Sequence, residues 1–87
     1  MAYRFALLPQ AEKQLQSLDR DVARRILKKL QWIEKQIQPL RFAVLLRQTK
    51  IGDARFRIGD YRVITLMDEK KKTITIAAIG HRREIYR

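Results

Sequence analysis

The apolar residues of this chain change their spacing at Pro39, and that change limits the possible folds more than any other feature of the sequence. Between Pro9 and Pro39 they recur every three or four positions, which is the period of an α-helix. After Pro39 they tend to alternate with polar residues, which is the period of a β-strand. A chain divided in this way is typical of an α+β fold, in which helices pack on one face of a sheet.

Two helices are predicted between the prolines. The first begins at Pro9, a residue suited to the first helical position, and runs to Leu18. The second follows the cap-type residues Asp19 and Asp21 and ends near Gln38, just before Pro39. Its apolar stripe is the strongest periodic signal in the chain and consists of Val22, Ile26, Leu30, Ile33 and Ile37. Trp32 lies beside this stripe, where it can extend the core or contribute to a binding surface.

Strands are predicted where apolar, aromatic and β-branched residues gather, at 3–8, 54–58, 61–67 and 73–79, with 44–50 as a further candidate. Turns are expected at 51–53 and 59–60, a hairpin loop at 68–72, and a break at Gly80. The order is therefore β-α-α-β-β-β, with room for one more strand. We expect a single small α+β domain over residues 1–87, with an antiparallel sheet and a helical hairpin packed on one face.

The composition excludes several classes of protein. The chain has 87 residues, no Cys and one His, so disulfides, thiolate chemistry and a structural zinc site are not expected. A core this small also argues against a buried cofactor. No apolar run is longer than five residues, which predicts no membrane span and no signal peptide. A cytoplasmic protein without metal or cofactor is the expectation.

The charge of the chain points to a polyanionic partner. Lys and Arg total 20 against 9 Asp and Glu, giving a formal net charge of +11 that is spread along the whole sequence. Nucleic acid, an anionic membrane surface and an acidic protein are all candidates. Arg outnumbers Lys by 12 to 8, which favours phosphate, because the guanidinium fork matches phosphate oxygens.

The strand pattern gathers part of this charge at one edge of the predicted sheet. In the strand 54–58, Arg55 and Arg57 face away from Phe56 and Ile58. The turn at 59–60 should then place Arg62 near Arg57. Because 73–79 runs antiparallel to 61–67, the cluster predicted at this edge contains Arg55, Arg57, Arg62, His81 and Arg82. Like charges gathered in this way are destabilising unless an anion lies among them.

Structural roles for the same residues remain open on spacing alone. Basic residues that point outward from a strand often form only a solvated face. Arg62 can pair with Asp60 or Glu69. His81 can be an ordinary surface or turn residue, and Tyr86 can be a packed aromatic side chain near the C-terminus.

Two segments of the second half carry a resemblance to a known family. Residues 56–64 (FRIGDYRVI) and the ending 80–86 (GHRREIY), together with the predicted order of elements, resemble the RelE/ParE toxin superfamily. The resemblance covers essentially the whole chain, by motif in the second half and by pattern in the helical half. It implies the toxin of a type II toxin–antitoxin pair, with an antitoxin protein of the RelB kind as its partner.

The RelE branch of the family implies a ribosome-dependent mRNA endonuclease that acts in the A site of the 30S subunit. Cleavage there needs no metal, since the 2′-OH of the RNA attacks the adjacent phosphate. The residues that match the catalytic pattern of the family are Arg57, Arg62, His81, Arg82 and Tyr86. RNA contacts, to mRNA and rRNA, are expected from Arg55, Arg57, Arg83, Lys28 and Lys29.

Within that pattern, the arginines are expected to stabilise charge on the phosphate, because guanidinium groups stay protonated and make poor bases. His81 or Tyr86 is then expected to move the proton, since histidine titrates near neutral pH. The alternatives are a ParE-like protein that inhibits DNA gyrase without catalysis, and an inactive module that only binds an antitoxin. The ending 80–86 favours the nuclease, because a terminal Tyr is a feature of the RelE branch.

Overall fold

The computed structural model describes residues 3–46 and 53–85, and its helices and strands follow the predicted order. The elements are β1 (Arg4–Leu7), α1 (Pro9–Gln16), α2 (Arg20–Glu34), the 3₁₀ helix η1 (Pro39–Phe42), β2 (Ala43–Leu45), β3 (Ala54–Ile58), β4 (Tyr61–Asp68) and β5 (Thr73–His81). The short β2 is the additional strand, and positions 47–52 of the expected strand and turn lie outside the described residues. The α+β class is confirmed.

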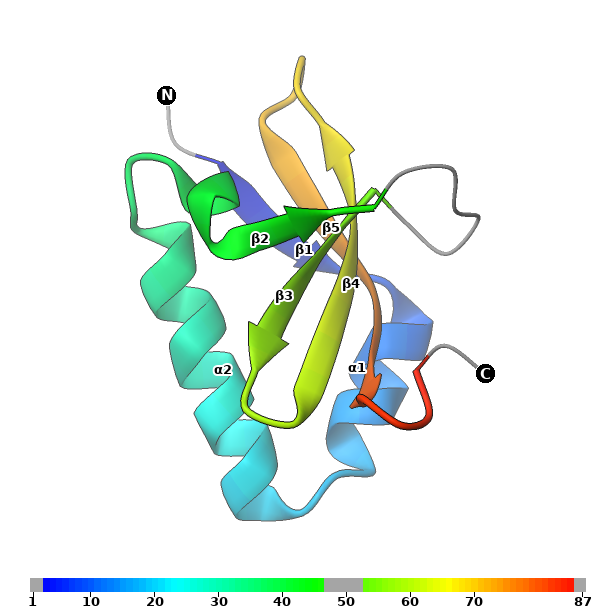
Figure 1. The fold of residues 1–87 in the computed structure, drawn as a ribbon. Helices are drawn as coiled ribbons and strands as arrows, with labels where there is room; N and C mark the ends of the chain where they lie inside the picture. Colours follow the sequence, from blue (N-terminus) through cyan, green and yellow to red (C-terminus); the bar gives the residue numbers. More distant parts are fainter. Residues whose placement is uncertain (1–2, 47–52, 86–87) are drawn as a thin grey trace.

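The five strands form one sheet in the order β1-β5-β4-β3-β2 (Figure 1). Strands β2 to β5 are antiparallel neighbours, but β1 runs parallel to β5. The sheet is therefore mixed, and the expectation of an antiparallel sheet was wrong for its first strand. The alternation of residues along a strand specifies its faces but not its direction, and the long helical connection after β1 permits either direction.

The two helices cover one face of the sheet, and the core lies between the two layers. Helix α1 contributes Ala11 and Leu15, and α2 contributes residues from the predicted stripe. They meet the inward side chains of the sheet, which are Phe56, Ile58, Val63, Ile74, Ile76 and Ile79. This arrangement leaves the other face without a helix, and we call it the open face.

Helix α2 is shorter than predicted, because it ends at Glu34 instead of near Gln38. The amide Nε2 of Gln36 donates a hydrogen bond to the Trp32 carbonyl oxygen at 2.8 Å and satisfies one of the acceptors left free at a helix end. The chain then turns, and Ile37 is 94% exposed. Ile37 is thus not part of the core, and the stripe ends at Ile33.

Side chains of both helices also accept hydrogen bonds from backbone amides on the β1 side of the sheet. The Phe5 amide donates to Glu34 Oε2 at 2.8 Å, which occupies a donor of the edge strand β1. Beyond the end of β1, the Ile79 amide donates to Gln14 Oε1 at 2.8 Å. Each helix is therefore fixed to the sheet by a polar contact as well as by its apolar side.

Candidate functional site

The open face carries the arginines of the two central strands. Arg57 lies directly opposite Arg62 in the β3–β4 pairing, and Arg55 lies opposite Ile64. Because Phe56 and Val63 point into the core, these three arginines belong to the opposite side of the sheet. The predicted approach of Arg57 to Arg62 across the turn is confirmed. Facing like charges of this kind are destabilising and favour an anion between them.

The two facing arginines have different surroundings. Arg57 is exposed, whereas Arg62 is only 6% exposed. Arg62 Nη1 donates to the carbonyl oxygens of Gly59 and Tyr61, each at 2.9 Å. Gly59 has a φ of +59°, so its carbonyl belongs to the tight turn that glycine permits. Arg62 therefore holds the β3–β4 turn in addition to placing a charge at this end of the sheet.

Arg82 reaches the same end of the sheet from the C-terminal segment (Figure 1). Its backbone amide donates to the Asp60 carbonyl oxygen at 2.8 Å, and its Nε lies 3.8 Å from Asp60 Oδ1. Both side chains of this ion pair are more than half exposed, so the pair is weak. Asp60 thus fixes the backbone of Arg82 beside the turn and pairs with Arg82.

Gly80 allows the C-terminal segment to fold over the open face. Contrary to prediction, the glycine does not break the last strand, because β5 continues through it to His81 and Gly80 pairs with Arg62. A β-carbon at this position would lie 3.1 Å from Ile85 Cδ1. The amides of Glu84 and Ile85 both donate to the His81 carbonyl oxygen, which closes the segment into a turn. The turn thereby holds Ile85 against Gly80, which pairs with Arg62.

His81 lies at the predicted end of the sheet but not on the face of the arginines. It pairs with Tyr61, and the two rings meet edge to face with centroids 5.5 Å apart, on the side of the sheet that packs against the helices. Its Nδ1 accepts a hydrogen bond from the Arg83 amide at 3.2 Å. The predicted position of residues 80–82 beside residues 61 and 62 is confirmed, but the His81 ring lies on the opposite face from Arg57 and Arg62. Tyr86 lies outside the described residues.

The other candidate RNA contacts lie on separate surfaces. Arg83 is exposed on the C-terminal segment, and Lys28 and Lys29 are exposed on α2. Lys28 lines a groove, and Lys29 Nζ lies 4.5 Å from the centre of the Trp32 ring. Lys28 and Lys29 therefore lie apart from the arginines of the sheet, whereas Arg83 follows Arg82 on the C-terminal segment.

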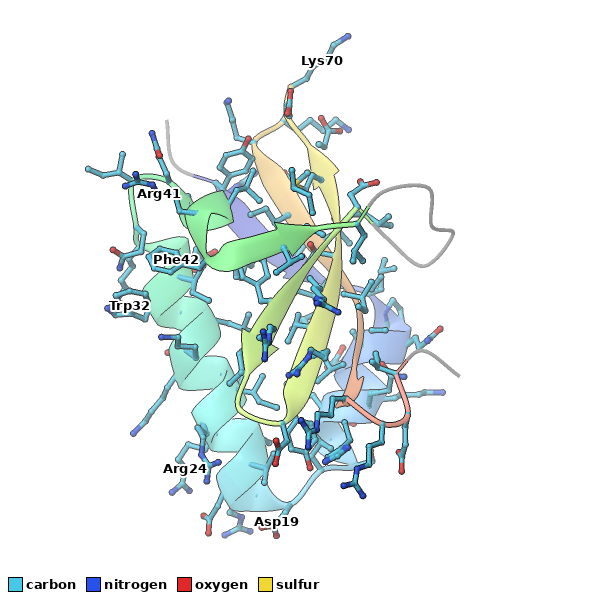
Figure 2. The ribbon with its side chains drawn as sticks, in the orientation of Figure 1. Asp19, Arg24, Trp32, Arg41, Phe42 and Lys70 are labelled. Carbon is cyan, nitrogen blue, oxygen red and sulfur yellow. The ribbon has the colours of Figure 1, made fainter. Side chains whose placement is uncertain are left out.

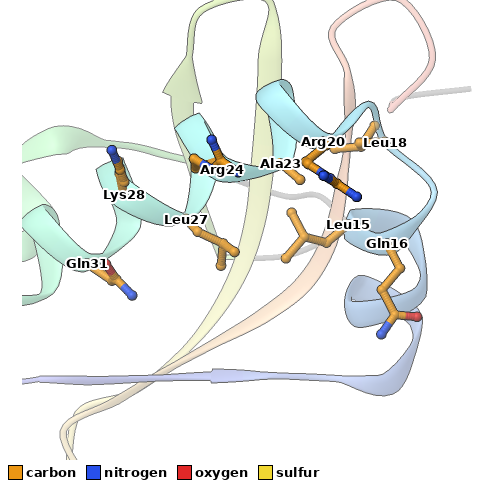
Figure 3. Close-up of a pocket in the computed structure, with 9 residues that line it drawn as sticks. All are labelled: Leu15, Gln16, Leu18, Arg20, Ala23, Arg24, Leu27, Lys28 and Gln31. Atoms are coloured by element: carbon orange, nitrogen blue, oxygen red, sulfur yellow. The ribbon is translucent and has the colours of Figure 1, made fainter.

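The groove between α1 and α2 was not predicted from the sequence. It has a volume of about 530 Å³, with apolar side chains facing into it and cationic side chains beside them (Figure 3). The residues that line it are Leu15, Gln16, Leu18, Arg20, Ala23, Arg24, Leu27, Lys28 and Gln31. Leu27 is the informative position, because it lies outside the apolar stripe of α2 and is 38% exposed. An apolar residue outside the stripe is the sequence feature from which this groove could have been predicted.

No cation site is visible in the part of the chain that the structure describes, since no three His, Cys, Asp or Glu side chains come together there. Within the same residues, none of the helices has the length and apolar character needed to cross a membrane. The open face itself presents the guanidinium groups of Arg57 and Arg62, which suit an anion.

The fold and the arginine-bearing open face define a class of small toxins, the RelE/ParE superfamily. The chain belongs to it, since the family model described as the ParE toxin of the type II toxin–antitoxin system parDE matches residues 5–86. The resemblance inferred from residues 56–64 and 80–86 is thus confirmed. No curated protein matches this chain.

Solved structures of RelE toxins share the fold. The chain is 35% identical to a chain of the archaeal RelE–RelB complex from Pyrococcus horikoshii OT3, with a TM-score of 0.74 over 97% of this chain and 99% of that one. The RelBE2 toxin–antitoxin complex from Mycobacterium tuberculosis gives a TM-score of 0.81 at 23% identity, over 94% and 100%. The isolated E. coli RelE toxin gives 0.64 at 22% identity, over 98% and 92%.

Proposed function

We propose that this toxin is a ribosome-dependent mRNA endonuclease that cleaves the codon in the A site of the 30S subunit, in the cytoplasm. The observation that carries the proposal is the facing pair Arg57 and Arg62 on the open face, with Arg82 held beside the same turn. Three guanidinium groups at one end of a sheet suit a phosphodiester better than an uncharged ligand. The 35% identity to an archaeal RelE supports the same branch of the family.

The reaction that these residues support is transesterification within the RNA. The 2′-oxygen attacks the neighbouring phosphorus, the bond to the 5′-oxygen breaks, and a cyclic phosphate and a 5′-hydroxyl are left. The proton lost by the 2′-OH goes to a base, and the leaving 5′-oxygen gains one from an acid. Arg57 and Arg82 are placed to stabilise the additional negative charge on the phosphate oxygens. No metal takes part in these steps.

The proposed proton-transfer group is one of the two residues that the sequence indicated, His81 or Tyr86. Tyr86 follows Ile85, which the structure seats on Gly80 beside the arginines. His81 faces Tyr61 on the other side of the sheet, and its Nδ1 is engaged by the Arg83 amide. A positioning role is therefore proposed for His81, and Tyr86 is kept as the proposed group for the proton.

An antitoxin of the RelB kind is the proposed protein partner, and the α1–α2 groove is its proposed docking surface. The groove combines apolar residues such as Leu15 and Leu27 with the cations Arg20, Arg24 and Lys28 (Figure 3). An amphipathic helix with acidic residues beside its apolar stripe complements this surface. Binding there leaves the open face to the RNA.

The test of the proposed activity uses purified protein, ribosomes programmed with a defined mRNA, and mapping of the 3′ ends that appear. Cleavage within the A-site codon, in the presence of a chelator, is expected. Intact mRNA combined with inhibition of purified DNA gyrase would instead establish the ParE-like activity. Intact mRNA and uninhibited gyrase would leave only an antitoxin-binding module.

A further inference from the structure

Two aromatic side chains meet on the surface at the end of α2. Trp32 lies in the last turn of the helix, and Phe42 is the final residue of η1. Their rings meet edge to face with centroids 5.0 Å apart. Trp32 is 46% exposed and Phe42 44%, so about half of each side chain faces solvent. Figure 2 shows both at the same side of the molecule, below Arg41.

Cations adjoin this aromatic pair. Lys29 Nζ lies 4.5 Å from the centre of the Trp32 ring, and Arg41 is an exposed neighbour of Phe42 in the chain. From Arg20 to Phe42 the sequence has seven basic and two acidic residues. One of the acids, Glu34, turns to the Phe5 amide, and the other, Asp21, is at the opposite end of α2. The cations shown beside the rings are therefore Lys29 and Arg41.

A hollow of about 370 Å³ lies against Phe42. It is lined by Gln36, Ile37, Gln38, Arg41 and Phe42. Glutamine amides offer both donors and acceptors, and Arg41 adds a planar group of donors. The hollow therefore places hydrogen-bonding groups beside an aromatic ring, which is the combination that proteins use to hold an unpaired base.

We propose that Trp32, Phe42, Lys29 and Arg41 form an aromatic platform that binds single-stranded RNA. A base stacks on the exposed rings, and the two cations contact the flanking phosphates. The platform adjoins the open face, because Phe42 leads directly into β2, which pairs with the strand of Arg55 and Arg57. The inference deepens the proposed function, and it rests on that function for the identity of the polyanion as RNA.

An RNA strand fits this surface better than a protein partner does. Exposed rings combined with several cations match a ligand that has both π faces and regularly spaced negative charges. The α1–α2 groove, by contrast, is concave and lined with aliphatic residues, which suits a helix. The two surfaces are therefore assigned to different ligands.

Trp32 is the only tryptophan in the chain, so its fluorescence reports on the platform directly. The probe is a ten-nucleotide single-stranded RNA titrated into the whole protein at several salt concentrations. We expect quenching of the Trp32 emission and an affinity that falls as salt rises. Phe42→Ala should weaken binding about tenfold. Leu45→Ala, at another exposed apolar residue, on β2, is the control and should bind as the wild type does.

A parallel cleavage assay on programmed ribosomes separates this inference from the proposed function. Phe42→Ala should raise KM and leave kcat unchanged, since the platform does not touch the scissile phosphate. Quenching of Trp32 by RNA without any cleavage would overturn the endonuclease and keep the platform. The platform is overturned if RNA leaves the emission unchanged, if Phe42→Ala binds with wild-type affinity, or if only an antitoxin quenches Trp32.

Discussion

At the scale of single residues, the facing arginines show how one pair combines structure and function. Arg62 is buried and donates to two carbonyl oxygens of its own turn, so a substitution there alters the fold as well as the charge. Arg57 is exposed on the same face and can be changed without leaving a buried acceptor unsatisfied. Charge reversal at Arg62 is therefore a poor test of function, and Arg57 is the better position.

We predict that Arg57→Ala reduces cleavage of ribosome-bound mRNA by about 10²-fold, which is typical when one stabilising donor is removed from a transition state. Its thermal unfolding midpoint should stay near that of the wild type. Arg4→Ala is the matched control, because Arg4 is an exposed arginine on the same face at the far end of the sheet. Equal losses in the two variants would show that only overall charge matters.

His81 is predicted to act through position and not through proton transfer. Its Nδ1 accepts from the Arg83 amide, and an asparagine at this position can supply a carbonyl oxygen in the same place. His81→Asn should therefore retain most of the cleavage rate, whereas His81→Ala should lower it and loosen the C-terminal segment. The pH dependence of kcat distinguishes positioning from proton transfer. If a titrating step of the wild type is absent in His81→Asn, the histidine transfers the proton.

At the scale of elements, the C-terminal end of β5 depends on a contact between a glycine and an isoleucine. Strand β5 passes through Gly80 without interruption, and a β-carbon at position 80 would lie 3.1 Å from Ile85 Cδ1, a tight contact. The turn that follows is closed by two amides that donate to the His81 carbonyl oxygen. A glycine in the strand thus permits the close approach of the terminal segment to the sheet.

We predict that Gly80→Val displaces Ile85 and lowers mRNA cleavage while the sheet remains folded. Valine is well suited to a strand, so the pairing of β4 with β5 should persist, and far-ultraviolet circular dichroism should be unchanged. Protease digestion of the C-terminal segment should become faster. The control is Thr75→Val, which also introduces a valine on the same face of β5. Full activity in Gly80→Val would mean that the contact between Ile85 and Gly80 is irrelevant to catalysis.

At the candidate site, the sequence predicts which residues pair across the strands more accurately than it predicts the face of the sheet on which each side chain lies. A two-residue turn leaves one pairing for the strands that flank it, so Arg57 and Arg62 had to face each other. The face of His81 was missed because Gly80 was expected to end the strand, and a strand that continues places residues 80 and 81 on opposite sides.

Other differences arise from contacts that a local pattern does not contain. The end of α2 is set by a side-chain hydrogen bond from Gln36, which helical periodicity does not report. The parallel direction of β1 depends on its pairing with the last strand of the chain. The aromatic pair was missed because Trp32 and Phe42 come together only after the chain turns between α2 and η1.

At the scale of the whole molecule, part of the charge of +11 lies on three distinct surfaces. The arginines of the sheet belong to the open face, Arg20, Arg24 and Lys28 border the α1–α2 groove, and Lys29 and Arg41 adjoin the aromatic platform. Each surface has a different apolar component, which suits a different ligand. The net charge of the sequence therefore indicates a polyanion without distinguishing RNA from an acidic protein.

We predict that Leu27→Asp weakens antitoxin binding by at least tenfold, because it places a carboxylate among the apolar residues of the groove. Ribosome-dependent cleavage by the purified variant should remain at the wild-type rate. Isothermal titration with the cognate antitoxin measures the first effect. Leu66→Asp, at an equally exposed leucine on the open face, serves as the control. An unchanged affinity for Leu27→Asp would place the antitoxin elsewhere.

The parallel pairing of β1 with β5 also bears on when this toxin can become active during its own synthesis. Strand β1 finds its partner only after residues 73–76, about seventy positions later in the chain, have been made. The core face of β5 and the terminal segment beside the arginines are added last. A nascent chain therefore cannot complete the sheet until residues 73–81 have been made, so the folded toxin domain cannot exist before that point of synthesis.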